Sequence, residues 1–276
     1  MKESILEVKH LSFAYDGNRM ALKDVSVTIY QQEKIAVLGA NGAGKSTFFL
    51  NLNGVRELET GEITYRGEVI NKKNKNKLRR KVGIIFQDPD HQIIASTVKA
   101  EVAFGPLNMG LPREEAEERT MDAIRVMGLE DYLFRPPHYL SGGEKKRVSI
   151  ADILAMDCEV MIFDEPTASL DPANAKMLEE VLNRIGEEGR TILLSTHDVD
   201  FACRFADRIL VFYDGRLIGD GSPERIFTDE ELLKTANLKK PVLMELQELL
   251  AKRGLLGGGG RCPKSVEEFA SLFPAH

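Results

Sequence analysis

Residues 39–47 of this 276-residue chain read GANGAGKST, a glycine-rich stretch that fits the pattern G-x-x-x-x-G-K-[ST]. The apolar run Lys34–Leu38 before it predicts a short buried strand, and the residues from Lys45 to Leu52 predict a helix. Glycines permit a tight turn between the two, so successive backbone N–H groups and the helix N-terminus point at one anion. The stretch therefore predicts a loop that binds the phosphates of a nucleoside triphosphate.

The side chains of this loop assign two further tasks. Lys45 is expected to reach the β- and γ-phosphates, and the Ser46 hydroxyl is expected to ligate Mg²⁺. The other residues of the loop are expected to contact the nucleotide as well. The predicted nucleotide-binding residues of the loop are Gly39, Asn41, Gly42, Ala43, Gly44, Lys45, Ser46 and Thr47.

Composition narrows the classes of protein to which this loop can belong. The net charge of −6 argues against nucleic acid as the main partner, and we expect none. No apolar run approaches the roughly 18 residues that span a bilayer, and residues 1–4 lack the apolar core of a signal peptide. Three widely spaced cysteines fit a reducing compartment rather than a disulfide framework or a zinc site. We therefore expect a cytoplasmic protein.

Polar side chains follow three further apolar runs that predict buried strands. Asp164 and Glu165 come directly after residues 160–163, Gln87 follows residues 81–86, and His197 stands just beyond residues 191–195. Ligand-binding groups gather at the carboxyl ends of strands in α/β sheets. A strand that ends in two carboxylates resembles a Walker B element, although such a pair also serves as a structural ion-pair site.

The rest of the chain predicts an α/β domain with a helical insertion. Further strands are expected near residues 5–15, 25–30 and 61–65, with a closing hairpin over 209–218. Residues 88–158 change to helical character, with helices over 113–127 and from 142 to about 157, and Asp171 is a suitable N-cap for a helix to about 185. We expect one large domain over 1–236 and a small appendage over 237–276. Toward the C-terminus, helices are expected after Ser222, Pro241 and Ser265, with a flexible linker at Gly257–Gly260.

Two features leave alternatives open. Tyr15 ends its predicted strand, where its ring can stack on a nucleobase or simply pack against neighbours. The basic run over residues 72–81 suggests nucleic acid or anionic lipid, but no aromatic residues interleave it. We interpret that run as a solvated loop leading into the next strand.

Taken in order, these motifs resemble those of the ATP-hydrolysing subunits of ATP-binding cassette (ABC) transporters, over roughly residues 4–235. Residues 140–144, LSGGE, are similar to the signature motif of that family, and they stand ahead of the Walker B element as they do there. Gln87 matches the Q-loop, residues 168–171 match the D-loop, and His197 matches the H-loop. Tyr15 matches the aromatic residue that stacks on adenine.

The resemblance implies a P-loop NTPase fold of the ABC type: a RecA-like core sheet, an antiparallel β-subdomain, an inserted helical subdomain and a C-terminal helical appendage. It also implies roles for single residues. Ser46 and Gln87 would ligate Mg²⁺ with Asp164, directly or through water, and Glu165 would be the general base. His197 would contact the γ-phosphate. Ser141, Gly142, Gly143 and Asp171 are assigned to nucleotide binding, with Ser141 and Gly143 facing the nucleotide of a second subunit.

A complete site would therefore need two copies of the chain, or this chain and a close relative, in a head-to-tail dimer that ATP closes. Residues 86–98 and 102–108 are similar to the segment after the Q-loop in energy-coupling-factor (ECF) importers, including cobalt-transport ATPases. Separate membrane subunits would then carry cobalt, nickel or a vitamin, and would dock near Gln87 and the helical subdomain. That position is peripheral, on the cytoplasmic face of the membrane.

Two other functions remain to be weighed against import. One is a non-transport ABC ATPase in DNA repair or translation, but the chain has neither long coiled coils nor a second cassette. The other is a nucleotide-dependent switch without catalysis. The presence of both Glu165 and His197 argues against a switch.

Overall fold

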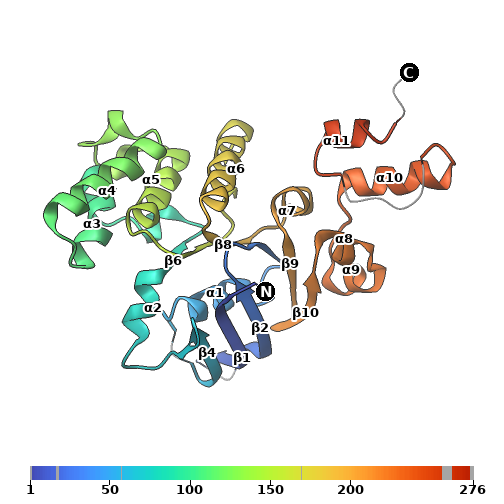
Figure 1. Ribbon diagram of the computed structural model, residues 1–276, viewed down its shortest axis with the longest axis horizontal. Coiled ribbons are helices and arrows are strands. Elements are labelled where there is room, and N and C mark those ends of the chain that lie inside the picture. The colour runs from blue at the N-terminus through green and yellow to red at the C-terminus, as the bar shows by residue number, and fades with distance from the viewer. Residues whose placement is uncertain (1, 17–18, 57, 169, 257–262, 274–276) are drawn as a thin grey trace.

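A six-stranded sheet forms the centre of the molecule, in the order β10-β9-β3-β8-β7-β6 (Figure 1). The structure is a computed structural model that describes residues 2–16, 19–56, 58–168, 170–256 and 263–273. All strands of this sheet run parallel except β10, which pairs antiparallel with β9 at one edge. Its strands are β3 (Lys34–Leu38), β6 (Val82–Ile85), β7 (Val160–Phe163), β8 (Thr191–Ser195), β9 (Arg208–Tyr213) and β10 (Arg216–Gly221).

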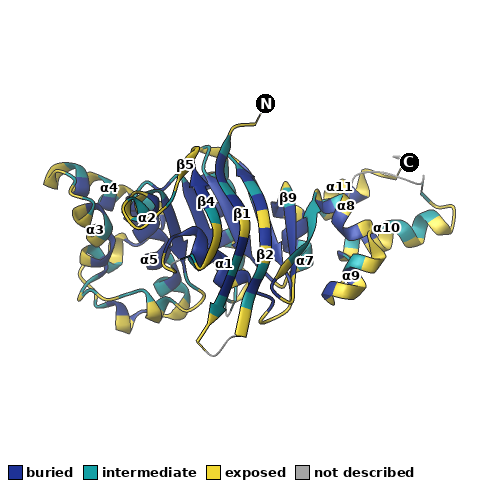
Figure 2. Ribbon diagram, turned by 90° about the horizontal axis from the view of Figure 1, so that it is seen from below, coloured by how far each residue is buried: buried dark blue, intermediate teal, exposed yellow. Residues whose placement is uncertain are grey.

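Both faces of this sheet are covered, which explains why its parallel strands read as continuous apolar runs. Every residue of β6, β7 and β8 is buried, and in Figure 2 the colour of buried residues is concentrated in the middle of the molecule. The covering helices include α1 (Lys45–Leu52), α6 (Pro172–Glu187) and α7 (Val199–Phe205). The predicted strands over 81–86, 160–163 and 191–195 and the predicted helix over 171–185 are confirmed.

A second, antiparallel sheet of order β2-β1-β4-β5 packs beside α1. Its strands are β1 (Ser4–Tyr15), β2 (Arg19–Tyr30), β4 (Thr60–Tyr65) and β5 (Glu68–Val69). Leu6, Val8 and Leu11 of β1 join a core with Phe48 and Phe49 of α1. The antiparallel subdomain is therefore fixed against the helix that begins in the phosphate loop. β2 begins earlier than the predicted strand over 25–30, and residues 17–18 before it lie outside the described residues.

Between β6 and β7 the chain forms a group of helices, the helical subdomain, on the left of Figure 1. It contains α3 (Val98–Asn108), α4 (Arg113–Val126) and α5 (Gly142–Ala155), which pack on one another. The predicted apolar face of α4 is buried, including Ala116, Ala123 and Ile124. Its helical periodicity was sufficient to predict both the helix and the side that it buries.

The basic run over 72–81 is not the loop that we expected. Residues Lys75–Lys81 form helix α2, with Leu78 buried beneath it. Asn71 and Asn74 build the turn before it, because the Asn71 N–H donates to Asn74 Oδ1 at 2.7 Å and the Lys73 N–H donates to Asn71 Oδ1 at 2.8 Å. Lysine and arginine are good helix formers, and their charges in the last turn favour the negative end of the helix dipole.

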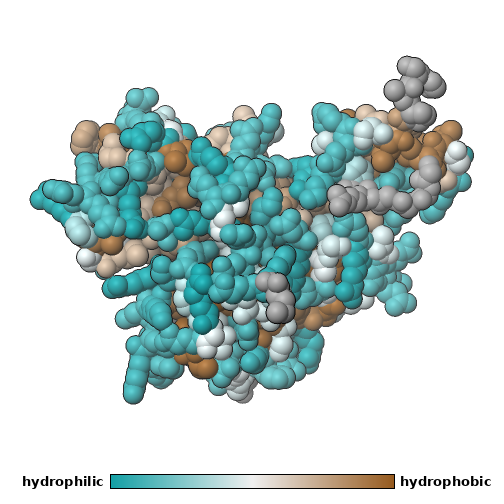
Figure 3. Space-filling view, viewed as in Figure 1, coloured by the Kyte–Doolittle hydropathy of each residue, from teal (hydrophilic) through white to brown (hydrophobic). Residues whose placement is uncertain are grey.

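The chain ends in four short helices: α8 (Pro223–Thr228), α9 (Glu230–Ala236), α10 (Val242–Lys252) and α11 (Val266–Ala270). α8 and α9 pack on β9 and β10, at the edge of the six-stranded sheet. α10 and α11 extend from it, and apolar side chains colour their surface in Figure 3. The expected linker at 257–260 lies outside the described residues. Among those residues, no helix is both long and apolar enough to cross a bilayer.

A cluster around Glu159 joins the two sheets. Arg66, in the turn between β4 and β5, donates to Glu159 Oε2 through Nε at 2.9 Å and Nη2 at 2.8 Å. Lys81 Nζ lies 3.0 Å from Glu159 Oε1. Burial favours the protonated acid, but hydrogen bonds from Lys81, Arg66 and Tyr65 lower the pKa of Glu159 to about 2.

We expect this cluster to contribute stability that acid removes. Because the folded pKa lies below the unfolded value, the contribution is complete above about pH 5 and is lost as the pH falls toward 2. Urea unfolding at pH 6 should show Glu159→Gln less stable than the wild type by about 1 kcal/mol, the upper end for partly exposed pairs. The difference should shrink at pH 4 and pH 3. A constant difference would mean that the Glu159 charge is not what stabilises the junction.

Candidate functional site

The phosphate loop borders an open pocket of about 380 Å³ at the carboxyl end of β3. Two of its glycines are required by close packing. A Cβ at Gly39 would lie 2.3 Å from the Phe212 carbonyl oxygen, and one at Gly44 would lie 2.7 Å from the Ala21 carbonyl oxygen. Both glycines also have positive φ. The pocket is lined by Tyr15, residues 40–47, Gln87, Asp164, Glu165 and residues of the neighbouring turns.

The Lys45 side chain folds back onto the phosphate loop. Its Nζ donates to the Gly39 carbonyl at 2.6 Å and lies 3.8 Å from Glu165 Oε1. The side chain is 6% exposed, and burial lowers the pKa of the amine, although Glu165 and Asp164 act to raise it. A buried ammonium aimed into a pocket is suited to an anionic ligand.

The two carboxylates of the predicted Walker B element have different surroundings. Asp164 accepts a hydrogen bond from Ser195 Oγ at 2.6 Å, which fixes it at the base of the pocket. Glu165 Oε1 lies 3.0 Å from His197 Nε2, and His197 Nε2 lies 2.9 Å from Asn41 Oδ1. Three strand ends thus meet in one site, because β8 lies between β3 and β7 in the sheet.

Glu165 carries two marks of a constrained functional residue. Its backbone has φ of 47°, a left-handed conformation that disfavours residues with a side chain. The Ser195 hydroxyl accepts a hydrogen bond from its N–H at 2.8 Å and holds this turn. Burial raises the pKa of the Glu165 carboxyl, opposed by His197 and Lys45. A carboxylate with a raised pKa is better able to accept a proton near neutral pH.

Tyr15 stands at the rim of the pocket. Its hydroxyl lies 3.1 Å from Thr47 Oγ1, and its ring packs edge-on against Phe13. The Arg56 guanidinium lies 5.3 Å from the ring centroid. With 38% of its surface exposed, Tyr15 retains an accessible ring at the pocket, as stacking on a base requires.

The residues of the signature motif do not reach this pocket within the same chain. Ser141 caps α5 on another part of the surface, where it accepts a hydrogen bond from the Glu144 N–H and Glu144 accepts one from the Ser141 N–H. Gly142 lines a second hollow of about 490 Å³, which Gln87 also borders, and Gly143 lies against the Asn174 side chain. Asp171 caps α6, as predicted, by accepting a hydrogen bond from the Asn174 N–H at 2.9 Å. Ser169, in the D-loop, lies outside the described residues.

Two residues that the sequence patterns did not single out belong to the site. Ser195 bonds to both Asp164 and the Glu165 backbone, and its place at the end of a buried strand was the signal that could have identified it. Lys146 of α5 is 3% exposed, and its Nζ donates to the carbonyls of Phe86 and Gln87, each at 2.8 Å. Burial lowers its pKa to about 8. Sequence spacing alone gave no indication of this contact.

The donor atoms at the pocket suit a hard cation that is held jointly with a nucleotide. Ser46 and Gln87 are exposed there, and Asp164 is buried at its base, so the set offers hydroxyl, amide and carboxylate oxygens. Among the described residues, no group of three or more His, Cys, Asp or Glu side chains is placed to hold a metal ion alone. Water molecules and the phosphate oxygens of a nucleotide are the further ligands that such a cation takes.

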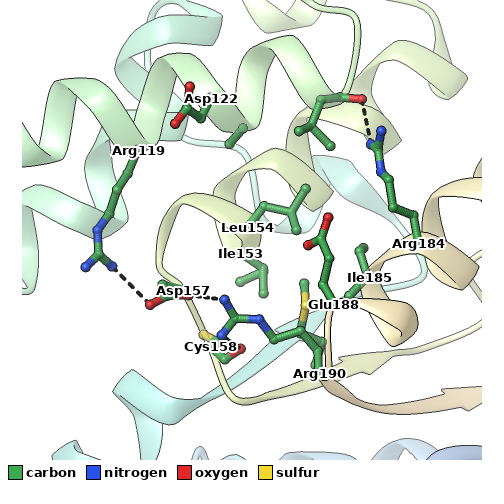
Figure 4. A pocket seen from close by; sticks show the side chains of 13 residues that line it. Arg119, Asp122, Ile153, Leu154, Asp157, Cys158, Arg184, Ile185, Glu188 and Arg190 are labelled. Atoms are coloured by element: carbon green, nitrogen blue, oxygen red, sulfur yellow. Dashed lines mark hydrogen bonds and ion pairs between the residues drawn. The ribbon is translucent and has the colours of Figure 1, made fainter. Parts of the chain in front are cut away.

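A different cavity, of about 430 Å³, lies at the junction of the helical subdomain with α6 (Figure 4). Asp157 accepts a hydrogen bond there from Arg190 and lies 3.5 Å from Arg119 of α4. Arg184 of α6 donates to the Val126 carbonyl at the end of α4 at 3.4 Å. This cavity shares no lining residue with the phosphate-loop pocket, and its contacts join α4 to the core.

Comparison with known proteins gives consistent matches. A family described as "ABC transporter" matches residues 22–168. The energy-coupling factor transporter ATP-binding protein EcfA2 of Methanospirillum hungatei is 46% identical over 273 residues, which cover 98% of this chain and 68% of that protein. The solved structure of cbiO1 from Clostridium perfringens, described as part of the ABC transporter complex cbiONQ, is similar at a TM-score of 0.75. It is 39% identical and covers 90% of this chain and all of that chain.

A second solved structure bears on assembly. The ATP-binding cassette MJ0796, described as a dimer in a post-hydrolysis state bound to ADP and Pi, is similar at a TM-score of 0.72. It is 27% identical and covers 79% of this chain and 99% of that chain. These likenesses confirm the expected fold class: an α/β nucleotide-binding domain with an antiparallel subdomain and an inserted helical subdomain.

Proposed function

This chain belongs to the ABC transporter ATP-binding family, and from that premise we propose that it is the ATP-hydrolysing subunit of an ECF-type importer. Subunits of this family are ATPases, so ATP is the substrate of the pocket. The observation that carries the proposal is the meeting of Lys45, Glu165 and His197 at one phosphate loop, with the signature motif directed elsewhere.

Phosphoryl transfer to water depends mainly on positioning and on stabilising charge. Backbone N–H groups of residues 42–47 and the Lys45 ammonium would hold the phosphates, with Tyr15 against the base. Mg²⁺, when bound through Ser46, Gln87 and Asp164, would supply charge stabilisation. Glu165 would orient the attacking water and accept its proton, and His197 would hold Glu165 while contacting the γ-phosphate.

Each chain would supply one half of each of two nucleotide sites. Ser141, Gly142 and Gly143 stand at the start of α5 and do not line the pocket, which supports their contact with the nucleotide of another subunit. A head-to-tail dimer with itself or with a close relative brings each signature motif onto the partner's loop, where Asp171 would lie near the same interface. Since ATP would bind both halves, it would favour the closed dimer, and hydrolysis would reopen it.

We also propose that the chain acts at a membrane. It would sit peripherally on the cytoplasmic face, and integral-membrane subunits would dock near Gln87 and the helical subdomain. Exposed apolar side chains lie there on α3, including Phe104 and Leu107, which are 50% and 52% exposed. The similarity of residues 86–108 to ECF importers supports a metal ion or a vitamin as cargo. We favour cobalt, with nickel as the alternative.

The test is recovery of the complex from membranes, followed by transport. An affinity-tagged chain, expressed in its native host, should co-purify with integral-membrane subunits after detergent extraction. Reconstituted in vesicles with ATP outside, the complex should take up radiolabelled cobalt, with nickel and vitamins measured in parallel. The same complex with Glu165→Gln should not transport. ATP hydrolysis without any membrane partner would favour the non-transport class of ABC ATPase.

A further inference from the structure

Lys146 contacts the backbone of Phe86 and Gln87, and the proposed reaction assigns this contact no role. It lies in α5, five residues beyond Ser141, or about 7.5 Å along the helix axis. Its side chain is almost completely buried, yet it carries an amine. Both hydrogen bonds that the structure shows for Nζ go to main-chain carbonyls, those of Phe86 and Gln87. A charged group is buried only at a cost in free energy, which these two bonds offset.

The contact is aimed at a functional segment. Phe86 and Gln87 follow β6 and leave the core sheet for the helical subdomain, and the Gln87 side chain lines the phosphate-loop pocket. The charges of Asp164, Asp88 and Glu165 favour the protonated form of the Lys146 amine, and two of these acids line that pocket. Lys146 thus lies directly behind the backbone that presents Gln87 to the nucleotide.

A second contact keeps the same segment on α5. Lys145 Nζ lies 2.6 Å from Asp90 Oδ1, on the short 3₁₀ helix Pro89–His91. Further along, Gln92 Nε2 donates to the Ser149 carbonyl at 3.3 Å. Residues 86–92 are therefore attached to α5 at several points, so α5 and this segment are expected to move together.

We propose that Lys146 is a positioning residue, which ties the Gln87 backbone to the helix that Ser141 caps. Contact of Ser141 with the partner's nucleotide would then also set the position of Gln87 over the nucleotide bound in the same chain. This inference rests on the proposed function. It adds to that function a physical link between the half-site on α5 and the half-site at the phosphate loop.

This link predicts how a change at Lys146 affects turnover, Mg²⁺ dependence and ATP affinity. Lys146→Met keeps an unbranched apolar stem but removes the donor, so Phe86 and Gln87 lose their anchor. We expect the turnover number to fall about 10- to 100-fold and the Mg²⁺ concentration for half-maximal activity to rise, with ATP affinity within about threefold of the wild type. Lys99→Met is the matched control, since it removes a helical-subdomain lysine that pairs with a carboxylate, Glu117.

A double-mutant cycle with Gln87→Ala provides the decisive measurement. If Lys146 acts through Gln87, Lys146→Met should add little, less than about threefold, to the loss already caused by Gln87→Ala. If the turnover of the double variant instead fell by the product of the two single-variant losses, the inference would be overturned. If Lys146→Met fails to fold, Lys146→Gln, which retains a neutral amide donor, replaces it in the same double-mutant cycle.

Hydrogen exchange separates local release from general destabilisation. Amides of residues 86–92 should exchange faster in Lys146→Met, while those of α4 keep the wild-type rate. Equal acceleration in both segments would overturn the inference by showing a merely structural role. The wild type tests the proposed function, which is wrong if the wild type hydrolyses no ATP. If the wild type hydrolyses ATP but the losses of turnover multiply in the double variant, only the role of Lys146 is wrong.

Discussion

Glu165→Gln should lower the ATP turnover number by about 10²- to 10⁴-fold, the usual contribution of a positioned general base. Glutamine keeps the size of the side chain and its place beside His197 and Lys45, but its amide cannot accept a proton from the attacking water. On the transition-state scale, this loss corresponds to about 3–5 kcal/mol. Steady-state phosphate release measures it directly.

ATP binding should survive the same change. The phosphates are assigned to residues 42–47 and to Lys45, not to Glu165, so the affinity for ATP should stay within about threefold of the wild type. Without hydrolysis to reopen it, the closed dimer should accumulate and be visible by size-exclusion chromatography with ATP. Lys45→Ala should show the opposite pattern, with nucleotide affinity itself lost.

Glu187→Gln, at the exposed end of α6, is the matched control for removing a carboxylate, and it should leave turnover unchanged. If Glu165→Gln hydrolysed ATP at the wild-type rate, the assignment of the general base would be wrong. Weak ATP binding by Glu165→Gln would show instead that its carboxylate contributes to holding the nucleotide.

Ser141→Arg should abolish both ATP-dependent dimerisation and hydrolysis, with at least a 100-fold loss of turnover. Ser141 is exposed at the N-terminus of α5, where the partner's γ-phosphate is proposed to lie. The long arginine side chain would occupy the space that the partner's loop must enter. Binding of ATP to the chain's own pocket should persist, because Ser141 does not line it.

The change also removes a helix cap, so its effect on folding needs a separate control. Ser141→Ala loses the hydrogen bond to the Glu144 N–H without adding bulk, at a cost of about 1 kcal/mol in stability. The difference between the alanine and arginine variants isolates the steric block. A Ser141→Arg variant that dimerised and hydrolysed normally would exclude the head-to-tail arrangement.

Mixing two inactive variants tests the shared site further. In a dimer of Ser141→Arg with Lys45→Ala, one site keeps an intact loop and an intact signature motif, while the other loses both. ATP should therefore produce mixed dimers although neither variant dimerises alone. A heterologous contact, in which different surfaces of the two subunits meet, is what makes this complementation possible.

Much of the fold could be predicted because it depends on local patterns. The strand before the phosphate loop, the helix after it and the buried face of α4 each follow from the periodicity of a few adjacent residues. Helix α2 was missed, since its charged residues resemble a solvated loop. A single buried contact, through Leu78, determines which face of it packs.

The sequence by itself determined the chemistry of the phosphate loop: residues 39–47 specify a triphosphate site, because a strand, a glycine turn and a helix N-terminus are contiguous in the chain. Only the tertiary structure brought Glu165 and His197 to Lys45, since those residues are far apart in sequence and meet through the order of β3, β8 and β7. The same order brought Ser195, at the end of β8, to Asp164. Strand order in a sheet is a long-range property, which no local pattern encodes.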